Sequence, residues 1–111
     1  MAEKDIIEKN LKEYLEIGDY AYSKKHYKSA VIMYYKALVE LCDLTLLRTI
    51  NKIGINHNER FELLKNSAPE LYEIASKLFR FYSDSYNKEI TETIATLVKK
   101  EVDHAKRTAS P

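Results

Sequence analysis

The chain has 111 residues, of which 45% are apolar and 32% are charged, and its 18 Lys and Arg nearly balance its 17 Asp and Glu. This length corresponds to one domain, residues 1–111, and a net charge of +1 excludes a whole-protein field that would attract nucleic acid or membranes. With only two Gly and two Pro, the chain lacks the turn-forming residues of a sandwich or barrel, so the composition favours long helices.

The single cysteine excludes an internal disulfide, which fits a reducing compartment. The longest uncharged run, residues 29–35, is far shorter than the ~20 residues needed to cross a bilayer, and residues 1–10 lack the apolar run of a signal peptide. We therefore expect a cytoplasmic protein that does not contact membranes. Its richness in Lys, Glu, Ile and Tyr is typical of thermophilic proteins.

The first predicted helix covers residues 3 to about 24, where apolar side chains recur every three or four positions. Gly18 lies inside it, and a helical Gly costs about 1 kcal/mol relative to Ala. We interpret Gly18 as the site of close approach by a neighbouring helix, and we expect Ala30 at that contact. The short polar connection at 24–27 predicts an antiparallel hairpin.

The second predicted helix starts at Tyr27 and ends near Arg48 to Lys52. Its stretch 27–47 is apolar on almost every side, which is typical of a central helix. Besides its main apolar face it carries a second stripe, made of Ile32, Tyr35, Val39, Cys42 and Leu46. A bundle this small need not cover both faces, so we expect the second stripe to form a homodimer interface.

The connection after the second helix carries its own local signals. Gly54 is expected to take a left-handed turn, and Asn56 or Asn58 to cap a short third helix that runs through Leu64.

Ser67-Ala68-Pro69-Glu70 matches a capping box and predicts the start of a fourth helix. A last helix is expected over residues 89–106, followed by a frayed tail at 108–111. The predicted fold is all-α: an up-and-down helical bundle of four main helices plus one short helix.

No cluster of residues in the sequence matches a known catalytic motif. His26, His57 and His104 have no partner at metal-ligand spacing, and Cys42 lies mid-helix among apolar residues, where a cysteine is usually inert. We therefore expect no catalytic residue, no metal and no cofactor. Nine tyrosines could form a stacking surface for bases, but most fall at helical core positions, which favours packing.

Residues 14–42 resemble a single tetratricopeptide repeat. The resemblance is carried by small and aromatic residues at the repeat's positions: Tyr14, Ile17, Gly18, Tyr27, Ala30, Tyr34 and Ala37. It implies a helical adaptor that binds other proteins.

A second resemblance covers most of the chain. Its features are the pattern Tyr-x-x-Ala-x-x-x-Tyr-x-x-Ala-Leu from Tyr27, then His57, Phe61-Glu62-Leu63-Leu64, Leu71-Tyr72, Arg80 and Ser85-Tyr86. These features resemble the HEPN family, small helical bundles of bacteria and archaea often encoded beside a minimal nucleotidyltransferase. The resemblance implies an up-and-down bundle, usually a homodimer, with a nucleotidyltransferase, RNA or a nucleotide as partner.

Active HEPN proteins cut RNA with an Arg followed, after four to six residues, by His. Here Arg80 matches the Arg, but Tyr86 stands where the His would be, and Tyr is a poor general base because its ordinary pKa is about 10. The resemblance therefore implies binding without efficient ribonuclease activity, with Arg80, Tyr86 and Asp84 as candidate binding residues. Alternatively, Arg80 and Asp84 form a surface ion pair.

Overall fold

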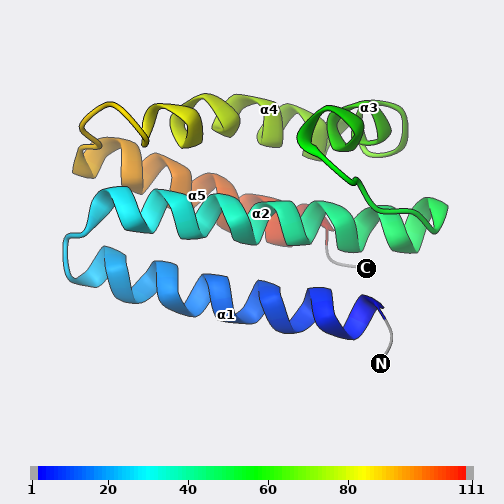
Figure 1. The fold of residues 1–111 in the computed structure, drawn as a ribbon, viewed down its shortest axis with the longest axis horizontal. Coiled ribbons are helices and arrows are strands. Elements are labelled where there is room, and N and C mark those ends of the chain that lie inside the picture. The colour runs from blue at the N-terminus through cyan, green and yellow to red at the C-terminus, as the bar shows by residue number, and fades with distance from the viewer. Residues whose placement is uncertain (1–2, 110–111) are drawn as a thin grey trace.

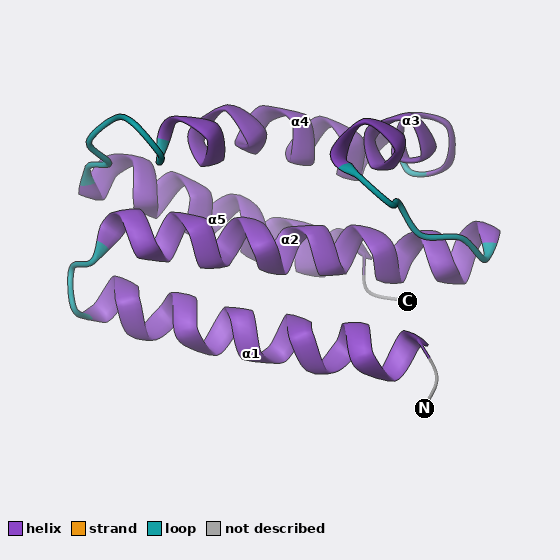
Figure 2. Ribbon diagram, viewed as in Figure 1, coloured by secondary structure: helices purple, strands orange, loops and turns teal. Residues whose placement is uncertain are grey.

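Helices make up most of residues 3–109, the part of the chain that the computed structural model describes, and no strand occurs there (Figure 2). The helices are α1 (Glu3–Ser23), α2 (Tyr27–Ile50), α3 (His57–Ser67), α4 (Pro69–Asp84) and α5 (Glu92–Ala109). Successive long helices run in opposite directions (Figure 1). The predicted all-α bundle of four main helices and one short helix is confirmed.

The helix α2 is the centre of the bundle. In Figure 1 it lies between α1 and α4, with α5 behind it. Its buried side chains face all three of these helices, and Ala30, Val31 and Leu38 are completely inaccessible to solvent. The prediction of a central helix is therefore confirmed, and it follows from an apolar sequence with no single polar face.

Gly18 marks a close contact between α1 and α2, as its position in the sequence predicts. A Cβ atom there would lie 2.8 Å from Cδ1 of Tyr34, too close for any real contact. The Tyr34 hydroxyl donates a 2.7 Å hydrogen bond to Oδ1 of Asp19, the residue next to Gly18. The nearest atoms belong to Tyr34 and Met33, so the ring of Tyr34, rather than Ala30, fills the space that Gly18 leaves.

The turn after α2 differs from the prediction for Gly54. Asn51 takes the left-handed conformation, with φ 56° and ψ 38°, and its N–H donates to the carbonyl oxygen of Leu47. Gly54 has no positive φ. It is required for space instead, because a Cβ there would lie 2.6 Å from Cβ of Arg60.

The start of α3 confirms one of the two predicted caps. The Asn56 side chain accepts a 2.8 Å hydrogen bond from the N–H of Glu59, which satisfies a backbone donor in the first turn.

The capping box expected at Ser67 does not form. Ser67 is the last residue of α3, and the N–H of Ala68 still donates to the carbonyl of Leu64 at 2.7 Å. Pro69 then ends this hydrogen bonding because it has no N–H, and it becomes the first residue of α4. The break therefore comes after Ser67, and no side chain caps α4.

The last helix is displaced toward the C-terminus relative to the prediction. It begins at Glu92, where Oγ1 of Thr91 accepts from the N–H of Ile94 at 3.3 Å, and it continues to Ala109. Thr108 and Ala109, expected in a frayed tail, are helical, and the Ala109 carbonyl accepts a 2.8 Å hydrogen bond from Nη2 of Arg48. The rest of that predicted tail, 110–111, lies outside the described residues.

Across residues 3–109, none of the helices has the length and apolar character needed to cross a membrane.

Candidate groove over the central helix

One hollow of the surface lies over α2 and is lined by side chains of four helices, α1, α2, α3 and α4. Its volume is about 320 Å³. We call it the α2 groove, and its lining comprises Tyr14 of α1, Tyr35, Lys36, Val39 and Glu40 of α2, Ile55 and Asn56 of the connection, His57 and Arg60 of α3, and Tyr82 of α4. A larger hollow of about 490 Å³ lies between the start of α1 and the end of α2, and it contains none of the predicted site residues.

A buried ion pair fixes α3 and the connection beside the groove. Nε of Arg60 donates to Oδ1 of Asp43 at 2.9 Å, and Nη2 donates to Oδ2 at 3.2 Å. The same Nη2 donates to the carbonyl of Gly54 at 2.9 Å, while the Gly54 N–H donates to Asp43. Because Asp43 compensates its charge, Arg60 positions the groove wall and does not offer a free cation to a ligand.

His57, the first residue of α3, lies among aromatic rings. Its ring centroid is 5.0 Å from that of Phe79 and 6.1 Å from that of Tyr35. Within residues 3–109 its Nδ1 atom is buried and has no hydrogen-bond partner. Burial, reinforced by the charges of Arg60 and Lys36, lowers the pKa of His57, so the imidazole is neutral near pH 7.

Two other groups at or beside the groove are poor nucleophiles or bases. Burial raises the pKa of the Cys42 thiol to about 12, and Cys42 is only 1% exposed. The hydrogen bond with Tyr86, together with burial, raises the pKa of Tyr82 to about 12. Neither the Cys42 thiol nor the Tyr82 hydroxyl is therefore an activated nucleophile.

Lys36 and Glu40 are the partly exposed charges of the groove, one helical turn apart on α2. Neither forms an ion pair with any of the described residues 3–109. Burial, and then the charge of Asp43, raises the pKa of Glu40, while a hydrogen bond with Asn10 opposes the shift. The groove therefore offers one unpaired ammonium group and one carboxylate.

The stripe predicted as a dimer interface is largely covered within the chain. Tyr35, Cys42 and Leu46 are 2%, 1% and 0% exposed, and Tyr35 stacks on Tyr82 with ring centroids 4.6 Å apart. Ile32 and Val39 remain partly exposed. The open part of the stripe is thus narrower than expected, since α3 and α4 pack against the rest.

In the part of the chain that the structure describes, no hydrogen bond or ion pair joins the three candidate binding residues near the end of α4 to one another. Arg80 is exposed, and no hydrogen bond or ion pair joins it to another residue of 3–109. Asp84 pairs with Lys88 at 3.5 Å, so the alternative pair with Arg80 is not formed. The hydroxyl of Tyr86 lies 2.8 Å from the hydroxyl of Tyr82. Tyr82 is two positions after Arg80, so these two side chains leave α4 on different sides.

The pairing of Asp43 with Arg60 and the place of Lys36 and Glu40 in the α2 groove were not predicted from the sequence. One signal was present: Asp43 stands between apolar residues, Leu41 and Cys42 before it and Leu44 after it, and a buried carboxylate needs a partner. The partner, 17 residues away, has no periodic relation to it.

Among residues 3–109, no three or more His, Cys, Asp or Glu side chains are grouped so as to hold a metal ion. Comparison of the chain with protein-family models, with curated proteins and with solved structures found no match.

Proposed function

We propose that this protein is a HEPN-like helical bundle that acts by binding a partner, and that the α2 groove is the binding surface. One observation carries the proposal: the middle of α2, which is mostly buried, opens to solvent between α1 and α4, and there it presents the unpaired Lys36 beside Val39. An unpaired ammonium group next to exposed apolar side chains is typical of a surface that a partner covers.

The chemistry of the groove supports binding rather than covalent catalysis. A covalent mechanism needs an activated nucleophile of the protein, and the thiol of Cys42 is buried and strongly disfavoured as a thiolate. The HEPN resemblance links Arg80 to RNA cleavage. Arg80 lies on α4, and no hydrogen bond joins it to His57 of the groove. We therefore expect RNA to be bound without efficient cleavage, if RNA is the partner.

The partner candidates are a cognate nucleotidyltransferase, RNA and a nucleotide, and the protein itself is proposed to be a homodimer. These candidates rest on the HEPN resemblance. The close contact of Gly18 with Tyr34 favours the second candidate function, a tetratricopeptide-like adaptor for other proteins, because small residues that admit a large ring join the two helices of such a repeat.

Titration of the three candidate partners tests the proposal. A labelled single-stranded RNA, ATP and a minimal nucleotidyltransferase are each titrated into wild type, Lys36→Ala, Arg80→Ala and the control Lys9→Ala. If the groove is the site, Lys36→Ala weakens binding and the other two variants match wild type.

Loss of binding in Arg80→Ala alone would instead assign the site to α4. If wild type binds none of the three partners, the HEPN-like function is wrong. Gel analysis of the RNA after incubation tests cleavage, and we expect intact RNA.

A further inference from the structure

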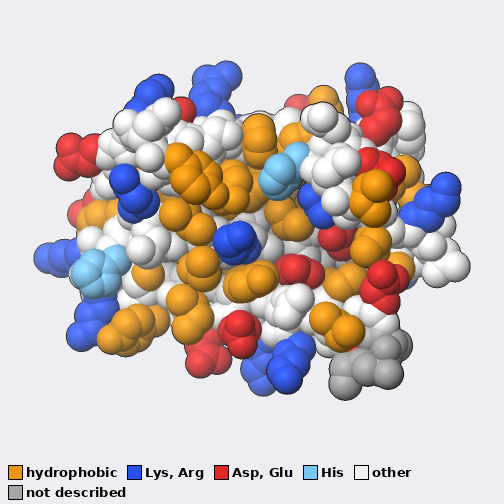
Figure 3. All heavy atoms as spheres, in the orientation of Figure 1, with side chains coloured by type: hydrophobic (Ala, Val, Ile, Leu, Met, Phe, Trp, Pro, Cys, Tyr) orange, Lys and Arg blue, Asp and Glu red, His pale blue; other side chains and the backbone are white. Residues whose placement is uncertain are grey.

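The open side of α2 is a straight apolar stripe flanked by two other helices. Ile32 and Val39 are partly exposed along it, and α1 and α4 run on either side (Figure 1). In Figure 3 hydrophobic side chains gather along the middle of this face, over α2 and α4, with basic side chains among them. The stripe from Lys28 to Glu40 spans about three helical turns, or about 18 Å.

Exposed apolar side chains also stand on the rims of the α2 groove. Ile55, which lines it, is 78% exposed, and Tyr86, which contacts the lining residue Tyr82, is 67% exposed. On the opposite rim Ile17 is 46% exposed and lies one helical turn from Tyr14. Apolar residues on both rims and on the floor form a surface that a second apolar element would cover.

Three lysines lie around the start of α2, where the helix dipole is positive. Lys24 and Lys25 precede the helix and Lys28 lies in its first turn, which contains no acidic residue. Cations at a helix N-terminus are unfavourable by about 0.3–1 kcal/mol each, because that end of the helix dipole is already positive. Lys24 and Lys25 also follow the C-terminal end of α1, where cations are favourable. Lys28 has no such compensation, so an external anion near the start of α2 would stabilise it.

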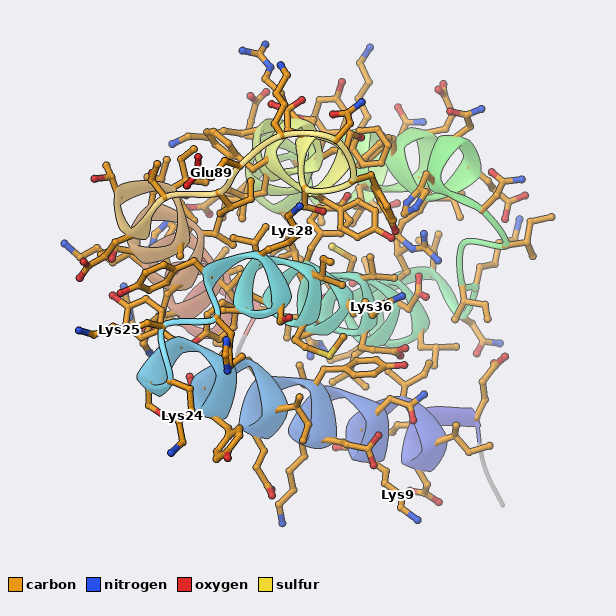
Figure 4. The ribbon with its side chains drawn as sticks, turned by 60° about the vertical axis from the view of Figure 1, so that its left-hand side comes forward. Lys9, Lys24, Lys25, Lys28, Lys36 and Glu89 are labelled. Carbon is orange, nitrogen blue, oxygen red and sulfur yellow. The ribbon has the colours of Figure 1, made fainter. Side chains whose placement is uncertain are left out.

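Figure 4 shows how these charges are arranged. Lys28 and Lys36 lie along α2, two turns apart, while Lys24 and Lys25 lie at the α1–α2 connection. No ion pair joins any of these four to another residue in the described part of the chain. Glu40 lies one turn beyond Lys36, so the stripe is cationic toward the start of α2 and anionic beyond Lys36.

We propose that the occupant of the α2 groove is an amphipathic α-helix of a partner protein, apolar on one face and acidic opposite Lys28 and Lys36. The inference rests on the proposed function, since it names the class of partner for the same site. A groove with apolar side chains on its rims and along its floor, between the charges of Lys36 and Glu40, matches the helix-in-groove mode of recognition. A helix antiparallel to α2 also brings its negative C-terminal end to the lysines at the start of α2.

Nucleic acid fits the same groove less well. Its affinity grows with the number of phosphates that Lys and Arg neutralise, but Arg60 is already neutralised by Asp43 and Glu40 would repel a phosphate. Base stacking needs a free ring face, and Tyr35 and Tyr82 of the groove each have one face covered by the other.

Two synthetic amphipathic peptides of about 20 residues test the proposal, since that length covers the stripe. They share the same Leu positions and differ only in two flanking residues, spaced like Lys28 and Lys36, which are Glu in one peptide and Lys in the other. Fluorescence anisotropy measures their binding to the full chain. We expect wild type to bind the Glu peptide at least about tenfold more tightly than the Lys peptide, a difference of about 1.4 kcal/mol.

The charge-reversed variant Lys28→Glu/Lys36→Glu is expected to prefer the Lys peptide. Its matched control, Lys9→Glu/Lys100→Glu, carries the same change of net charge on the exposed faces of α1 and α5 and should keep the wild-type preference. Circular dichroism checks that each variant keeps its helix content. A third variant, Lys28→Gln/Lys36→Gln, should lose the preference without reversing charge.

Equal binding of the two peptides, or an unchanged preference in Lys28→Glu/Lys36→Glu, overturns the proposal. The proposal is also overturned if neither peptide binds. This includes the case in which a second copy of the chain occupies the groove and the Glu peptide does not displace it. If wild type binds RNA or the nucleotidyltransferase through Lys36 but neither peptide, the proposed function stands and the helix proposal is wrong. If the Glu peptide binds and none of the three candidate partners does, the helix proposal stands without the HEPN-like partners.

Discussion

At the scale of single residues, Asp43 decides how the chain leaves α2. Its carboxylate accepts hydrogen bonds from Arg60 and from the Gly54 N–H, so one side chain of α2 holds both the connection and α3. The two charged side chains are only 9% and 10% exposed, which means that either one alone would be a buried, uncompensated charge.

We predict that Asp43→Ala lowers the free energy of unfolding by about 3–5 kcal/mol, because it leaves the Arg60 guanidinium buried without its partner. The exposed pair of Lys77 and Glu101 provides the control, and Lys77→Ala should change stability by at most about 1 kcal/mol. Urea denaturation measures both. Equal effects of the two substitutions would show that burial adds nothing to the Asp43–Arg60 pair.

His57 makes stability depend on pH. Its pKa is lowered in the folded chain, so the folded state binds fewer protons than the unfolded state as the pH falls through the ordinary value of 6.5. The stability that neutral His57 supplies is therefore complete above pH 6.5 and is lost as the pH falls from there through its lower folded pKa. Thermal melts at pH 7.5 and below 6 should show a larger decrease in wild type than in His57→Gln. Parallel decreases in the two proteins would contradict this, since all other titrating groups are shared.

At the scale of helices, apolar periodicity and backbone chemistry were sufficient to predict the elements but not where each of them ends. The long helices follow from side chains repeated every three or four positions, and Asn56 caps α3 by a local hydrogen bond that the sequence reveals. Gly54 could not be interpreted correctly because the reason for it is its packing against Arg60 of α3, six residues later, which no local pattern indicates. The tail at 108–109 is helical because Arg48, far away in the sequence, binds the last carbonyl.

The candidate site was less predictable than the fold for the same reason. Exposure of Arg80 and burial of Cys42 follow from their positions on helices, but the neighbours of a side chain do not. Tyr86 is turned toward Tyr82 by a hydroxyl contact that no spacing rule specifies. The groove itself arises where three segments distant in sequence meet over α2.

The packing of the α1–α2 hairpin leads to a prediction for Ala30, which is completely buried. Ala30→Leu inserts three carbon atoms into a filled space and should lower the free energy of unfolding by about 1–3 kcal/mol. Ser29→Leu adds a similar bulk at the adjacent exposed position and should have little effect. A chemical melt of Ala30→Leu that coincides with wild type would mean that the hairpin has room at this position.

At the scale of the whole molecule, the open question is what covers the exposed side of α2. The homodimer predicted from the second stripe now depends on Ile32 and Val39, since the other three stripe residues are covered within the chain. We expect light scattering at tens of micromolar to give a dimer mass for wild type. Ile32→Glu/Val39→Glu should give a monomer, because charges in an apolar contact are strongly unfavourable.

Ile6→Glu, which changes an exposed isoleucine of α1 outside the groove, is the matched control and should remain dimeric. A monomer mass for wild type would contradict the prediction. A partner helix and a second copy would compete for the same two side chains, so the Glu peptide should convert the dimer to a monomer.

Because Cys42 is buried, the rate at which its thiol can be labelled measures how often the bundle opens. It is the only thiol of the chain, it is 1% exposed, and its raised pKa keeps it protonated at neutral pH. A thiol-specific reagent can therefore reach and modify it only when α3 and α4 separate from α2. The labelling rate of the unmodified wild type would then report how often the core opens, and a partner that covers the α2 groove would slow it without touching the sulfur.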